Sequence, residues 1–141
     1  MELSPTRDTH EQWARQAVRL AFEGAWKEAI ELNKRILEAF PDDVQAYNRL
    51  GHAYNQLGKR QEAAAAYRES LQRDPANAIA LRNLQQLAEL LGDKLDFDVQ
   101  AVLSEAERAA ALLLEEPVTE EEEEEEFEPE EDTIDEGGDE E

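Results

Sequence analysis

The chain has 141 residues and a formal net charge of −22, and this charge is concentrated at one end. Residues 115–141 hold 18 acidic residues and no lysine or arginine, which leaves 18 acidic and 14 basic residues in the rest of the chain. This composition argues against direct nucleic-acid binding, which needs a basic surface. It also argues against binding to anionic membranes, which would repel the acidic segment. The absence of cysteine excludes disulfides, thiol catalysis and cysteine metal sites.

The chain before the acidic segment is rich in Ala, Leu, Glu, Gln and Arg, which favour helices, and shows no alternation typical of strands. We expect helices over residues 10–22, 26–39, 43–56, 60–73, 77–91 and 97–115. Gly24, Gly58 and Gly92 stand where a left-handed residue can end a helix. Pro41 and Pro75 stop the second and fourth helices. The fold class is therefore all-α.

Short polar residues mark the expected helix starts. Residues 9–12 resemble a capping box, while Asp42 and Asn77 are expected N-caps. In the last helix, one apolar stripe predicts packing against the array; it contains Val99, Val102, Leu103, Ala106, Ala110 and Leu113. We interpret this helix as a cap, and a separate partner-binding helix is the alternative.

A sequence period of about 34 residues, a length typical of repeated helical hairpins, runs through the helical part. Shifted by one period, the sequence aligns aromatic, glycine, alanine and proline positions with one another. The aligned sets are Trp13 with Tyr47 and Leu81, Leu20 with Tyr54 and Ala88, Gly24 with Gly58 and Gly92, Ala29 with Ala63, Leu37 with Leu71, and Pro41 with Pro75.

The middle repeat resembles the tetratricopeptide repeat, a family of helix–turn–helix units with this period. It has Tyr47, Leu50, Gly51, Tyr54, Ala63, Tyr67 and Pro75 at the family's spacing. The first repeat departs from the pattern at Asn33, where an aromatic is usual, and the third at Gln85 and Phe97. The resemblance implies a right-handed α-solenoid of about two and a half to three repeats with a C-terminal capping helix, followed by a disordered acidic tail.

We expect the following domain organisation. Residues 1–8 are an N-terminal extension, residues 9–115 are the repeat domain, and residues 116–141 are a disordered acidic tail, because this composition cannot bury enough apolar surface to fold. Within the repeat domain the repeats span about 10–43, 44–77 and 78–115.

The sequence offers no catalytic constellation, cofactor motif or metal site. Its two histidines, His10 and His52, lack a second ligand at metal spacing, and its glycines do not form a phosphate-binding loop. We therefore expect a protein that is not an enzyme and that needs no cofactor. The N-terminus carries no secretory signal, and we expect a cytoplasmic monomer without membrane contact.

In the resembled family, the first helix of each repeat lines a concave groove. The matching positions, which would face into this groove, include apolar, amide and charged residues, which suit a peptide with an apolar anchor and exposed backbone groups. The expected groove residues are Val18, Phe22, Asn48, His52, Asn55, Gln56, Arg82 and Gln86. The alternative is that these polar residues only solubilise an exposed helix face.

Three interpretations of the acidic tail remain open. In the first it only solubilises the chain. In the second it binds a basic ribosomal, polymerase or nucleic-acid-associated protein as an acidic escort. In the third, Phe127 and Ile134 are apolar anchors of a linear motif, with Phe127 able to occlude the groove. The sequence therefore predicts an adaptor that binds a peptide or protein segment, with the acidic escort as the alternative.

Overall fold

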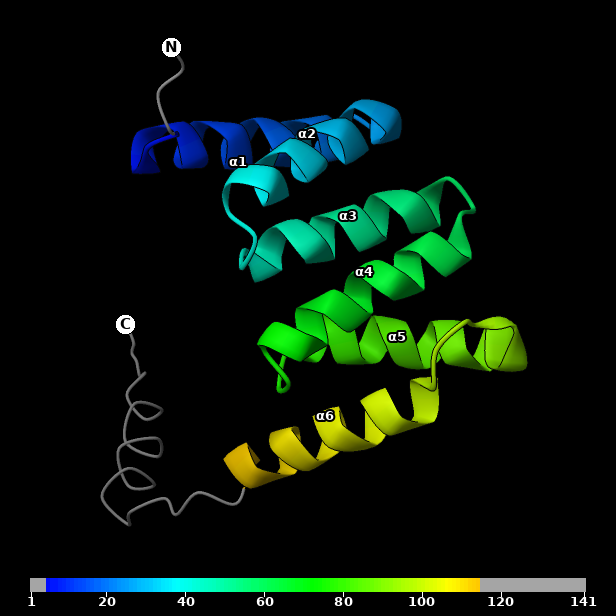
Figure 1. Ribbon diagram of the computed structural model, residues 1–141. Coiled ribbons are helices and arrows are strands. Elements are labelled where there is room, and N and C mark those ends of the chain that lie inside the picture. Colours follow the sequence, from blue (N-terminus) through cyan, green and yellow to red (C-terminus); the bar gives the residue numbers. More distant parts are fainter. Residues whose placement is uncertain (1–4, 115–141) are drawn as a thin grey trace, which may run out of the picture. The chain divides into compact units, whose positions relative to one another are not determined.

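The computed structural model describes residues 5–114, and all regular structure in this range is helical. Six α-helices follow one another as antiparallel hairpins (Figure 1). They are α1 (Arg7–Phe22), α2 (Trp26–Ala39), α3 (Val44–Gln56), α4 (Arg60–Arg73), α5 (Ala78–Leu91) and α6 (Val99–Leu114), with a short 3₁₀ turn, η1 (Gly92–Lys94), after α5. The all-α prediction is confirmed.

Helix ends follow local chemistry. α2 and α4 begin and end at the expected residues, because Gly24 and Gly58 take positive φ angles of 75° and 79° and prolines follow α2 and α4. The predicted start of α1 is wrong: Thr6 is the N-cap, and its side chain accepts a hydrogen bond from the amide of Thr9. Likewise Asp43 rather than Asp42 caps α3, whereas Asn77 caps α5 as expected.

The core consists of apolar side chains at the interfaces between successive helices. Tyr67 of α4 is 1% exposed, and its ring lies against Gly51 of α3. Burial raises the pKa of the Tyr67 hydroxyl to about 12. Val99, Leu103 and Ala106 of α6 belong to the same buried cluster as Tyr67, so α6 continues the packing of α4 and α5.

Polar side chains also join one hairpin to the next. His10 Nε2 of α1 lies 2.7 Å from the Oδ2 atom of Asp43, the N-cap of α3. Asn48 of α3 donates a hydrogen bond to Asn77, the N-cap of α5. Each junction between hairpins is therefore held by a bond from one odd-numbered helix to the cap of the next.

Cations over aromatic rings add a second set of contacts. Within hairpins, the Arg35 guanidinium lies 4.8 Å from the Trp13 ring centroid, and the Arg73 guanidinium lies 4.6 Å from that of Tyr47. Between hairpins, Lys34 approaches the ring of Tyr54 and Arg68 that of Phe97. Lys34 and Arg68 are one repeat apart, so the period places the two cations in equivalent positions.

Candidate binding surface on the odd-numbered helices

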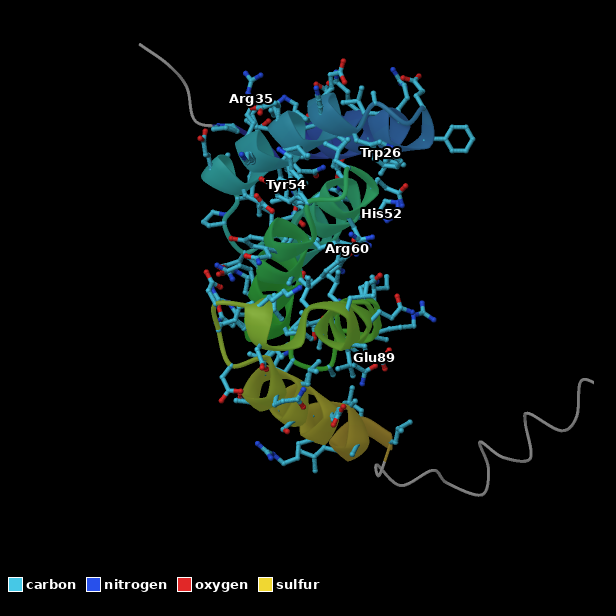
Figure 2. The ribbon with its side chains drawn as sticks, turned by 90° about the vertical axis from the view of Figure 1, so that its right-hand side faces the viewer. Trp26, Arg35, His52, Tyr54, Arg60 and Glu89 are labelled. Carbon is cyan, nitrogen blue, oxygen red and sulfur yellow. The ribbon has the colours of Figure 1, made fainter. Side chains whose placement is uncertain are left out.

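The outward side chains of α1, α3 and α5 form one surface, which we call the odd-helix face. In Figure 2, His52 of α3 and Glu89 of α5 point to the same side of the array, and Arg35 of α2 lies on the other side. The face consists of the predicted groove residues other than Asn48, together with Leu90 of α5: Val18, Phe22, His52, Asn55, Gln56, Arg82, Gln86 and Leu90.

The period arranges these residues in rows across the helices. One row holds Val18, His52 and Gln86, each one repeat from the next, and a second row holds Phe22, Gln56 and Leu90. The second row has apolar ends, because the side chains of Phe22 and Leu90 are 92% and 63% exposed. The odd-helix face therefore carries an amide in the centre of that row between two exposed apolar side chains.

Most polar groups of the face are free to bind a ligand. Within the described residues, the side chains of Asn55, Gln56 and Arg82 form no hydrogen bond to another part of the chain, and the same holds for His52 and Gln86. The His52 and Trp26 rings form an edge-to-face contact, with centroids 5.2 Å apart. Hydrogen-bonding capacity left unused at a surface is available to a partner.

Asn48 differs from the other predicted groove residues, because its amide is used inside the fold. It accepts a 2.6 Å hydrogen bond from the buried Ser70 hydroxyl and donates a 3.1 Å bond to Asn77. Asn77 in turn bonds Asp74. A substitution of Asn48 would therefore disturb the junction of α3, α4 and α5, and it cannot separate binding from stability.

Two features of this region were not identified from the sequence. Ser70 stands at a buried position, where its hydroxyl binds Asn48. Arg49 lies beside the face but turns inward, where its Nε donates to Asn33 and its Nη2 is buried without a partner. Burial lowers the pKa of the Arg49 guanidinium, against the opposing effect of Asp43. The departure of Asn33 from the repeat pattern is the only sequence signal of this pair.

The described part of the chain shows neither a metal-binding cluster nor a membrane-spanning helix. Residues 5–114 contain no group of three His, Cys, Asp or Glu side chains placed to hold a metal ion. None of the helices in this range combines the length and hydropathy needed to cross a membrane. The predicted tail anchors Phe127 and Ile134, and the expected disorder of 116–141, lie outside the described residues.

Comparison with known proteins supports the repeat assignment. Residues 44–77 match the family model described as tetratricopeptide repeat. The chain is 31% identical over 91 residues to the small glutamine-rich tetratricopeptide repeat-containing protein 2 of Mycosarcoma maydis. The aligned region covers 64% of this chain and 25% of that protein. It is 35% identical over 54 residues to the protein CTR9 homolog of Arabidopsis thaliana, covering 38% of this chain and 5% of that protein.

The chain thus spans a quarter or less of the length of these two relatives. The matched range 44–77 contains α3, α4 and the N-cap of α5, which form the centre of the hairpin array. Tetratricopeptide repeats are a non-enzymatic family of protein-interaction repeats. Sequence period, hairpin fold and family match agree that residues 44–77 are similar to a tetratricopeptide repeat and lie within an array of helical hairpins.

Proposed function

We propose that this chain is a non-enzymatic adaptor that binds a peptide or protein segment on the odd-helix face. The observation that carries the proposal is the set of solvent-accessible side chains without internal partners, with His52, Asn55 and Gln56 between the apolar Val18 and Phe22 on one side and Arg82 on the other. Phe22, Val18 and Leu90 are all exposed apolar side chains on this face, at 92%, 54% and 63%, and can serve as anchors for an apolar side chain of the partner.

The chemistry of this face suits a segment whose backbone groups are accessible. Amide side chains both donate and accept hydrogen bonds, so Asn55 and Gln56 can meet either backbone group of a peptide. Each such bond contributes about 1 kcal/mol net, and burying an apolar anchor against Phe22 contributes roughly 1.5–3 kcal/mol. Because micromolar binding corresponds to about 8 kcal/mol, a micromolar ligand needs several such bonds beside the apolar anchor.

We expect the double variant His52→Ala, Asn55→Ala to bind its partner about 30-fold more weakly, because two hydrogen bonds of about 1 kcal/mol each are lost. Helicity should change little, since neither side chain is hydrogen-bonded within the described fold, and the unfolding midpoint should fall only by the loss of the His52 contact with Trp26. The measurement is the amount of partner captured by each immobilised protein, with circular dichroism as the check on folding.

The matched control is Glu62→Ala, Gln72→Ala, which changes two exposed residues of α4. This control should capture the partner as the parent chain does. If the His52 and Asn55 variant also captures the same amount, the odd-helix face is not the binding surface.

The acidic-escort function is the second candidate, and it is favoured by 18 acidic residues without a basic one in 115–141. Such a segment attracts a basic partner, and salt weakens that attraction. Capture by the full chain and by a chain lacking 116–141, each at low and high salt, separates the two functions. Loss of a salt-sensitive partner on deletion supports the escort, and retained capture supports the odd-helix face.

A further inference from the structure

A cavity of about 780 Å³ lies along the first hairpin, between α1 and α2. Its wall contains three partly buried apolar side chains, Trp13, Leu20 and Leu32, and the polar Gln16. Glu28 and Glu31 of α2 border it. None of these residues belongs to the odd-helix face, so the cavity is a separate surface.

The repeat shows what the cavity is shaped to hold. Gln16, Leu20 and Leu32 correspond, one repeat further on, to Leu50, Tyr54 and Ala66. In the second hairpin these three positions are covered by α2, whose Ile30 and Leu37 pack in the same apolar cluster. A helix therefore already occupies the equivalent groove one repeat along the chain.

The cavity of the first hairpin is more polar than the equivalent groove of the second hairpin, so it can remain exposed to water. Where α3 presents the buried Ala46, Leu50 and Ala53, α1 presents Gln12, Gln16 and Arg19. These polar substitutions remove part of the apolar contact that a permanently packed helix would need. The apolar residues Trp13, Leu20 and Leu32 remain, which suits a helix that binds and dissociates.

Charge indicates the chemistry of the occupant. Glu28, Glu31 and Glu38 border the cavity and form no ion pair within the described residues. The cations Lys34 and Arg35 already face the rings of Tyr54 and Trp13, which leaves Lys27 as the remaining cation of the wall. Three carboxylates and three cations thus border the cavity, and the carboxylates, which have no ion-pair partner in the described residues, can each meet a lysine or arginine beside the apolar side of a ligand.

We propose that this cavity is a second docking site, which binds an amphipathic helix of a protein partner. The helix presents two aliphatic side chains seven residues apart, as Ile30 and Leu37 of α2 do in the second hairpin, and flanks them with basic residues. It takes the position that α2 takes on α3 and so extends the array by one helix.

The test uses a peptide derived from the helix that fills the equivalent groove. The probe is a fluorescently labelled peptide of residues 25–40 in which Glu28, Glu31 and Glu38 are replaced by lysine. The control peptide additionally carries Ile30→Ala and Leu37→Ala. Both peptides have the same charge, so any attraction to the acidic tail is equal, and both retain strong helix formers.

Anisotropy titrations with the full chain should show the probe binding at least about 10-fold more tightly than the control peptide, because two buried aliphatic side chains are lost. Gln16→Leu, which copies Leu50 of the second hairpin, should strengthen probe binding about 5-fold or more. Glu28→Lys, Glu31→Lys should weaken it about 5-fold. The charge-matched control Asp93→Lys, Glu105→Lys, on η1 and α6, should leave the preference for the probe unchanged.

Three results would overturn the proposal. One is equal affinity for both peptides, which assigns the binding to charge alone. Another is loss of probe binding in the His52→Ala, Asn55→Ala variant, which assigns it to the odd-helix face and leaves the proposed function intact. The third is a combination of two results: the chain shows no preference for the probe over the control peptide, and it self-associates in a way that Glu31→Lys abolishes. In that case a second copy of the chain is the occupant of the cavity.

Discussion

Gly51→Ala should destabilise the parent protein by about 1–2 kcal/mol yet stabilise a protein that also carries Tyr67→Ala. A Cβ at position 51 would lie 2.8 Å from the Cε2 and Cζ atoms of Tyr67, whose ring is fully buried. Overpacking of this kind costs about 1–3 kcal/mol. Alanine is favoured over glycine by about 1 kcal/mol inside a helix, and this gain emerges once the ring is gone.

Tyr67→Ala itself should be the most destabilising single change, at about 3–5 kcal/mol, because it empties the centre of the largest buried cluster. Since this is a large part of the stability of a small domain, Tyr67→Leu serves as a milder background that still frees the space. Urea unfolding followed by circular dichroism measures each single variant and each combination with Gly51→Ala. An equal cost of Gly51→Ala in all backgrounds would show that the ring is not what requires glycine.

Asn33→Ala should lower the free energy of unfolding by about 2–4 kcal/mol, a large effect for a small polar side chain. Asn33 is fully buried, donates a 2.8 Å bond to the carbonyl of Ala29 and accepts a 2.9 Å bond from Nε of Arg49. Its removal leaves Nε of Arg49 without a partner beside an Nη2 that already has none. Desolvating an unpaired charged group is the dominant cost.

Replacing both partners removes that cost, so Asn33→Leu, Arg49→Met should be close to the parent in stability, while Asn33→Leu alone remains destabilised. The two single variants and the double variant form a thermodynamic cycle measured by urea unfolding. Additive effects of the two substitutions would contradict a coupled Asn33–Arg49 pair.

Much of the fold could be predicted because glycines and prolines recur at the helix ends of successive repeats. Gly24 and Gly58 take positive φ angles just before α2 and α4, and prolines follow these two helices. The bounds of α2 and α4 are therefore predicted correctly. The cap of α1 is missed because Thr6 and Thr9 have the same chemistry three residues apart. Asp42 and Asp43 are adjacent acids, and only backbone geometry selects Asp43.

The candidate site was less predictable, because helical periodicity places a Cβ but not the end of a side chain. Asn48 lies in the same row as Ala14 and Arg82, yet its amide turns to Ser70 and Asn77. The contact of His52 with Trp26 joins residues of different hairpins, and local pattern contains no information on such a pair. The cavity beside Trp13 depends on what covers equivalent positions in two repeats, which only the packed structure shows.

The most direct test of the adaptor function is photo-cross-linking from single positions of the full chain. A photoreactive residue placed at His52 or Asn55 on the odd-helix face should cross-link to a protein partner, and the same residue at the exposed Gln72 of α4 should not. Cross-links from Gln72 alone, or none from His52 and Asn55 while the partner is still captured, would contradict binding on the odd-helix face.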